Sequence, residues 1–164
     1  MFDGSKDPRT KRNMKTIRSA LLIGLTALLI LPTWGEDTES AKNDMAQLQG
    51  EWSMASAGGG SQALPSDTLK NSKRVCKGDE TTVVVGGQLL IKAKFTLDPS
   101  KKPKRIDYQV TGGPNAGKTQ LGIYELSGDT VKFCFSAPGM DRPTDFTAKA
   151  GDGRTLSVWK RDKK

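Results

Sequence analysis

The sequence predicts an all-β fold, a small closed or nearly closed antiparallel barrel of about eight strands. Two observations lead to this prediction. The chain holds 18 glycines, and turn dipeptides such as Gly-Gly, Gly-Asp and Asp-Gly recur along residues 50–161. The segments between these turns alternate apolar with polar residues or are rich in β-branched residues. A closed barrel would also leave no unpaired strand edge in a small protein.

The expected strands follow one another at spacings of roughly ten residues. They lie at residues 51–55, 73–77, 81–85, 89–97, 105–110, 119–126, 131–135 and 155–161, and counting 145–148 brings the total to nine. The longest strand, 89–97, alternates strictly, which predicts an inward face formed by Leu89, Ile91, Ala93, Phe95 and Leu97. Residues 65–70 are expected to form a single helical turn.

Residues 1–35 are predicted to form a signal-peptide helix for export that precedes the fold. A short basic opening at residues 14–18 is followed by an apolar run at residues 20–31 and by small residues up to Gly35. Met14 is therefore the expected start. A membrane span needs roughly 20 apolar residues, so the shorter run favours a cleaved signal over an uncleaved anchor.

Export would leave a polar linker at residues 36–47 and a β-barrel domain at residues 48–164. Six of the 26 Lys and Arg residues and two of the 18 Asp and Glu residues precede residue 36, so 20 basic and 16 acidic residues remain and the net charge falls from +8 to +4. This excess is scattered, apart from Lys101–Arg105. No nucleic-acid partner is expected, because such proteins carry larger basic faces with stacking aromatics. The expected location is periplasmic or extracellular, the protein is expected to be a monomer, and membrane contact is expected only through the signal.

The chain has two cysteines, Cys76 and Cys134, and both lie in expected strands. An oxidising compartment would allow a disulfide between them. Two buried free thiols are the alternative, because cysteine packs as a small apolar residue. The sequence leaves both possibilities open.

Residues 112–119 read GGPNAGKT and match the phosphate-loop pattern G-x-x-x-x-G-K-[ST]. A phosphate loop must open a helix, because the helix N-terminus and its N–H groups bind the phosphates. Here only residues 119–126 precede the next turn, and they include a glycine together with β-branched and aromatic residues. We therefore interpret this segment as the connection of a hairpin.

No catalytic system is suggested by the residue types present. The chain has no histidine, which excludes Ser-His-Asp and Cys-His nucleophiles and imidazole metal ligands. The carboxylates that remain for acid–base work are Asp79, Asp98, Asp107, Glu125, Asp129, Asp141, Asp145 and Asp152. Most of them lie in turn contexts. No cofactor and no metal is expected, and an enzyme is the least favoured function.

Several runs of residues resemble the Planctomycetes uncharacterised domain family of small exported proteins. In chain order they are LQGEW (48–52), LPSDTLK (64–70), KGD (77–79), FTLDPSKKPKRID (95–107), GPNAGKTQLGIYELSGDTVKFCF (113–135), RPTDF (142–146) and LSVWKR (156–161). They cover nearly all of residues 48–161. The resemblance implies a domain in which the GGPNAGKT segment precedes a strand, and it implies no activity.

The family resembles the lipocalins in architecture. Lipocalins open their first strand with Gly-x-Trp, which here is Gly50-Glu51-Trp52. They close the barrel with a basic residue packed over that tryptophan, and the resemblance assigns this role to Lys160 or, by preference, Arg161. A cation over an indole face is a favourable contact.

The expected function is non-enzymatic binding of a small apolar ligand or a cell-envelope component. The residues expected to line the ligand site, or else to pack in a filled core, are Trp52, Leu89, Ile91, Phe95, Tyr108, Ile123 and Phe133. A ligand-binding barrel should contain a partly apolar cavity of a few hundred cubic ångströms. The alternative is a surface interaction module with a filled core, which would contact a protein partner through Lys101–Arg105.

Overall fold

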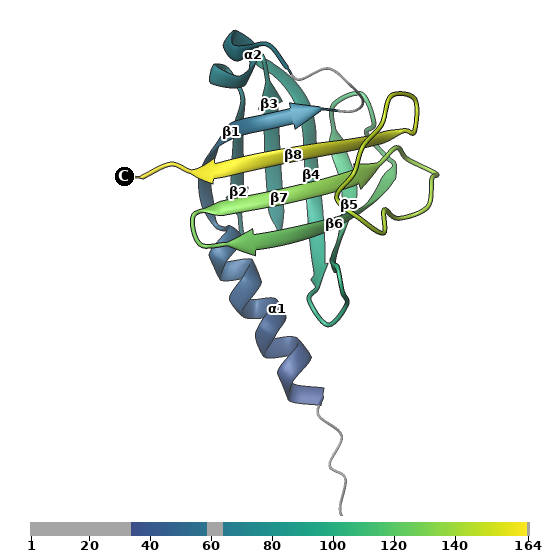
Figure 1. The fold of residues 1–164 in the computed structure, drawn as a ribbon. Coiled ribbons are helices and arrows are strands. Elements are labelled where there is room, and N and C mark those ends of the chain that lie inside the picture. The colour runs from purple at the N-terminus through teal and green to yellow at the C-terminus, as the bar shows by residue number, and fades with distance from the viewer. Residues whose placement is uncertain (1–33, 59–63, 164) are drawn as a thin grey trace, which may run out of the picture. The chain divides into compact units, whose positions relative to one another are not determined.

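The structure of the protein is a computed structural model that describes residues 34–58 and 64–163. In these residues eight antiparallel strands close into a barrel in chain order, with β8 pairing back to β1 (Figure 1). The elements are α1 (Trp34–Leu48), β1 (Gly50–Gly58), α2 (Ser66–Lys70), β2 (Lys73–Lys77), β3 (Glu80–Val85), β4 (Gln88–Asp98), β5 (Lys104–Gly112), β6 (Thr119–Ser127), β7 (Thr130–Ser136) and β8 (Arg154–Arg161). The predicted closed antiparallel barrel is confirmed. Residues 145–148 are not a strand but part of the loop between β7 and β8.

Aromatic side chains fill the middle of the barrel and the end nearer α1. They point inward from alternate positions of their strands, as the pleat of a β-strand requires. Those that are at most 3% exposed are Trp52, Phe95, Tyr108, Tyr124, Phe133 and Trp159. They belong to one contiguous core cluster, which also contains Leu48 from α1.

Strand β4 departs from the strict alternation that its sequence predicts. The pairing of β3 with β4 shifts between Val83 and Val84, so that Leu90 is an extra residue opposite the partner strand. Leu89 consequently points away from the core and is 47% exposed, which corrects the prediction that it faces inward.

Helix α1 spans the whole of the polar linker predicted at residues 36–47, so this segment is helical. Its contacts with the barrel come from a single stripe at helical spacing, where Asp44 and Leu48 are buried and Met45 is partly buried. Asp44 accepts a hydrogen bond from the Tyr124 hydroxyl (2.6 Å) and forms an ion pair with Lys104 (2.7 Å). The sequence pattern missed this helix because tertiary contacts of a few residues stabilise it, whereas most of its surface is polar.

Every carbonyl group of the last turn of α1 has a hydrogen-bond donor. These four groups, at residues 45–48, have no partner inside the helix. Gln49 donates from its side chain and its backbone N–H to the first two, Arg161 donates to the third, and the Trp52 indole donates to the fourth at 3.0 Å. The helix therefore ends on donors from Gln49, the residue that follows it, and from β1 and β8.

The predicted export signal and its start at Met14 fall almost wholly on residues 1–33, which lie outside the described residues. In the part of the chain that the structure describes, no helix is both long enough and apolar enough to cross a membrane.

Candidate functional site

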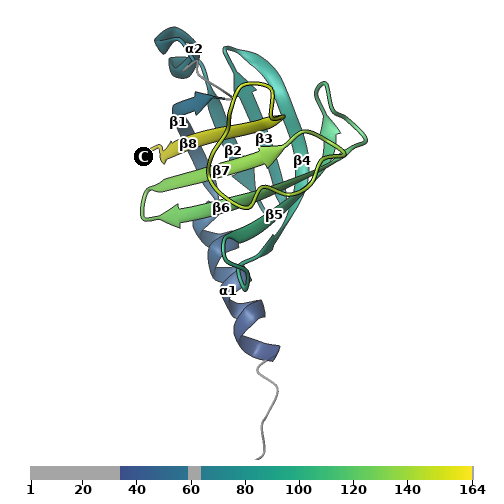
Figure 2. The same cartoon turned by 45° about the vertical axis from the view of Figure 1, so that its right-hand side comes forward.

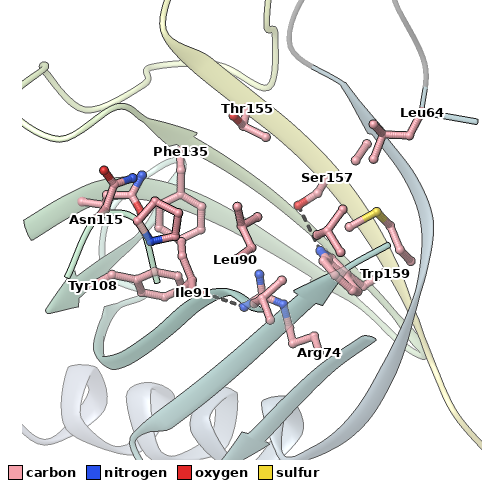
Figure 3. A pocket seen from close by; sticks show the side chains of 16 residues that line it. Leu64, Arg74, Leu90, Ile91, Tyr108, Asn115, Phe135, Thr155, Ser157 and Trp159 are labelled. Atoms are coloured by element: carbon pink, nitrogen blue, oxygen red, sulfur yellow. Dashed lines mark hydrogen bonds between the residues drawn. The ribbon is translucent and has the colours of Figure 1, made fainter. Parts of the chain in front are cut away.

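A cavity of about 340 Å³ occupies the interior of the barrel toward the end remote from α1 (Figure 3). The residues around it come from all eight strands and from two loops, and most are apolar. They are Met54, Ala57, Leu64, Arg74, Val83, Val85, Leu90, Ile91, Tyr108, Pro114, Asn115, Gln120, Phe135, Thr155, Ser157 and Trp159. Leu90 is 45% exposed, so the cavity reaches the protein surface at this end.

The GGPNAGKT segment forms one side of this cavity. It connects β5 to β6 as a hairpin, with the Gly117 N–H donating to the Val110 carbonyl at 2.8 Å and strand β6 following directly. Gly113 has a φ of 93°, and a Cβ there would overlap the backbone carbonyl of Leu90 on the neighbouring β4. Pro114 and Asn115 then lie against the cavity. The predicted hairpin connection is confirmed.

Arg74 is the one charged residue among those described around the cavity. It lies on β2 and is only 4% exposed. Its guanidinium carbon is 4.3 Å from the centre of the Phe133 ring and 4.9 Å from that of Trp159. Its Nη1 donates to the Tyr108 hydroxyl at 2.5 Å and to Thr81 Oγ1 at 3.3 Å.

These contacts hold the guanidinium in place without neutralising it. Among the side chains that the structure describes, no carboxylate forms an ion pair with Arg74, and its buried Nε has no hydrogen-bond partner. Removing an ion from water costs several kcal/mol, and each aromatic face returns about 1–2 kcal/mol. The hydrogen bonds to Tyr108 and Thr81 offset a further part of this cost. The interior nevertheless holds a cation without a counter-charge among the described residues.

Tyr108 does not supply the missing negative charge. Burial raises the pKa of its phenol above the usual value of 10.0, although the charge of Arg74 acts in the opposite direction. The hydroxyl is therefore protonated near neutral pH. It accepts the hydrogen bond from Arg74 and keeps its own O–H as a donor.

Two further polar side chains border the cavity. Gln120, on β6, is paired in register with Tyr108, and its buried Oε1 has no hydrogen-bond partner among the described residues. Ser157 accepts a hydrogen bond from the Trp159 indole at 2.9 Å. Neither residue offers a positive charge, so the electrostatics of the cavity are dominated by Arg74.

Of the residues expected to line a ligand site, Tyr108 and Ile91 border the cavity. Trp52, Phe95 and Phe133 face inward as expected but are not among the cavity residues, and they belong to the packed core.

Ile123 is buried on the outside of the barrel wall, which corrects its predicted inward orientation. It is paired in register with Cys134, whose thiol lies 3.6 Å from the Thr147 carbonyl. Arg142 from the same loop donates to the Gly122 carbonyl at 2.7 Å. The loop of residues 137–153 thus covers this outer face, and Figure 2 shows it crossing in front of the neighbouring strands.

Of the two possibilities that the sequence left open, the structure has two buried free thiols and no disulfide between them. Cys76 lies inside the barrel, where its thiol is 3.4 Å from Thr81 Oγ1. Cys134 faces outward, under the loop of residues 137–153. Because the two side chains lie on opposite faces of the barrel wall, they cannot reach each other.

The expected contact between the first and last strands is present. The guanidinium carbon of Arg161 lies 4.2 Å from the centre of the Trp52 ring, and the two residues are paired in register. Arg161 also donates to the Gln49 carbonyl at 2.7 Å. Lys160, the other candidate, is exposed on the outer face.

Several of the carboxylates considered for acid–base chemistry form hydrogen bonds within turns instead. Asp98, Asp145 and Asp152 each accept hydrogen bonds from groups two or three residues away. These hydrogen bonds lower the pKa of each carboxyl below its usual value of 3.8. Within the described residues no group of three or more potential ligands is arranged to hold a metal ion.

The sequence-based reasoning missed Arg74, although the sequence contained a signal for it. In the strand RVCKG, Arg74 is two residues from Cys76 and must share its face. A charged residue on the apolar face of a strand is unusual and points to a buried polar site.

The chain matches no protein-family model, no curated protein and no solved structure. The cavity and its residues therefore provide the basis for a functional interpretation.

Proposed function

We propose that this protein is an exported lipocalin-like barrel of the Planctomycetes uncharacterised domain type, and that it binds a small, largely apolar ligand in its cavity. The observation that carries the proposal is a cavity of about 340 Å³ in a barrel whose other end is packed with aromatic side chains. Its surroundings are apolar with a few polar groups, as is usual for small-molecule sites. The Gly-x-Trp opening and the contact of Arg161 with Trp52 support the lipocalin-like assignment.

Filling the cavity tests this function. Ala57 lies on β1 and borders the cavity, whereas Ala55 on the same strand is exposed. Ala57→Phe places a ring where the ligand would bind, and Ala55→Phe adds the same ring on the outside. The uncharged probe is 1-octanol, titrated into the full-length protein with tryptophan fluorescence as the readout, because Trp159 borders the cavity.

We expect saturable binding of 1-octanol to the unmodified protein and to the Ala55 variant, and loss of binding in the Ala57 variant. Overfilling a packed interior costs about 1–3 kcal/mol, so cooperative thermal unfolding must be shown for both variants. Equal binding to the two variants would contradict the proposal. So would failure of the unmodified protein to bind both 1-octanol and octanoate, its matched carboxylate.

A further inference from the structure

We propose that the ligand of the cavity is a small apolar monocarboxylate, and that its carboxylate binds the guanidinium of Arg74 and the hydroxyl of Tyr108. This inference rests on the proposed function and specifies the chemical class of the ligand. It follows from the buried cation, which has neither a counter-charge nor a full set of hydrogen bonds among the described residues.

The guanidinium of Arg74 has unused hydrogen-bond donors. An arginine carries five N–H donors in a planar fork, and the hydrogen bonds of Arg74 to described residues all come from Nη1. Figure 3 shows Arg74 beside Tyr108 within the group of side chains around the cavity. Because the ring of Phe133 covers one part of the guanidinium and that of Trp159 another, a ligand would approach the edge of the fork. A planar carboxylate matches that edge with paired hydrogen bonds.

The charge of the cavity indicates a monoanion. Arg74 is its only charged residue among those described, and Tyr108 adds a neutral donor. A phosphate would carry close to two negative charges, which a single guanidinium does not balance. Of the cavity residues, Gln120 has the other buried atom without a described partner, but its Oε1 accepts hydrogen bonds and so offers the anion nothing.

The size of the cavity limits the rest of the ligand. A water-sized group occupies about 30 Å³ of liquid, so a cavity of about 340 Å³ accommodates on the order of eleven non-hydrogen atoms. The apolar residues, such as Val83, Val85 and Ile91, would contact a hydrocarbon body. Octanoate is about this size, and 1-octanol is its matched uncharged analogue.

The experiment compares octanoate with 1-octanol on the full-length protein near neutral pH, by calorimetric titration. Hydrogen bonds to a charged group favour octanoate by roughly tenfold or more in dissociation constant. In Arg74→Met, which keeps an apolar chain between the aromatic rings, we expect this preference to be lost or reversed, because a carboxylate without a counter-charge is costly to bury. Arg105→Met removes an exposed arginine from the outer face of β5 and should keep the preference.

A second variant, Tyr108→Phe, tests the inference even if Arg74→Met does not fold. Tyr108→Phe keeps the charge and removes one hydroxyl, so the octanoate preference should fall by roughly threefold to tenfold. Equal affinities for the two probes in the unmodified protein would overturn the inference and leave the proposed function standing. An unchanged preference in Arg74→Met, or in Tyr108→Phe, would also overturn it. If neither probe binds, the proposed function itself fails.

Discussion

Replacing Arg161 with methionine tests how the last strand joins the barrel to helix α1. The Arg161 guanidinium covers the Trp52 ring and donates to the carbonyl groups of Gln47 and Gln49. The last turn of α1 contains no basic residue of its own, so Arg161 provides the positive charge that favours a helix C-terminus. Methionine would keep an apolar chain over the indole and remove the charge and both donors.

The expected loss of stability is about 3 kcal/mol. A cation over an indole contributes about 1 kcal/mol at a partly exposed site, and each hydrogen bond from a charged donor contributes about 1.5 kcal/mol. The Arg161 side chain is 27% exposed, so water replaces part of these interactions and the total is reduced. For a domain of this size, a loss of about 3 kcal/mol lowers Tm by roughly 10 °C.

The measurement is urea unfolding of the full-length protein, followed by tryptophan fluorescence. The urea midpoint should fall, while the slope of the unfolding free energy against urea concentration stays constant. That combination indicates a change in stability alone. Lys160→Met is the matched control, because Lys160 is the exposed neighbour on β8, and surface substitutions change stability by less than about 0.5 kcal/mol. A loss below about 1 kcal/mol for Arg161→Met, or equal losses in the two variants, would show that the Arg161 guanidinium does not stabilise this junction.

Two other substitutions test the wall of the barrel and its acid stability. A Cβ at Gly122 would overlap the Phe135 ring, which borders the cavity, so Gly122→Ala should cost about 1–3 kcal/mol and weaken 1-octanol binding; unchanged affinity would contradict this. Hydrogen bonds from Lys73 and Ser53 lower the pKa of Asp162 below its usual 3.8. The stability that the Asp162 carboxylate gives the folded protein is therefore complete at pH values above 3.8. It is lost as the pH falls through the lower pKa that Asp162 has in the folded state. The stability deficit of Asp162→Asn, below about 1 kcal/mol, should shrink across that acid range in thermal unfolding; a deficit that does not depend on pH would contradict the ion pair.

The barrel itself was predictable because strand alternation and turn residues are local signals. Residues such as Phe95, Tyr108 and Phe133 alternate with polar neighbours, and all three face inward. The contact of Arg161 with Trp52 followed from a motif at each end of the domain, which the closure of the barrel brings together.

The height of an inward-facing side chain along the barrel axis could not be predicted from alternation. Alternation reports which face of the sheet a side chain occupies, whereas its height depends on strand register and on shifts such as the one near Leu90. Tyr108 therefore borders the cavity while Phe95 and Phe133, which have the same pattern, are part of the packed core. Ile123 shows a related limit, because a distant loop buries it on the outer face.

The buried cation distinguishes the cavity from a packing defect. A void left by imperfect packing would be bordered by apolar atoms, and methionine at position 74 could fill the space between Phe133 and Trp159 without the cost of burying a charge. Arg74 instead brings a positive charge and unused donors to a cavity that has room for a partner. A residue that is locally unfavourable for folding and lies against such a space is the kind of inconsistency found at binding sites. Its chemistry selects an anion, and the apolar residues around it select a hydrocarbon.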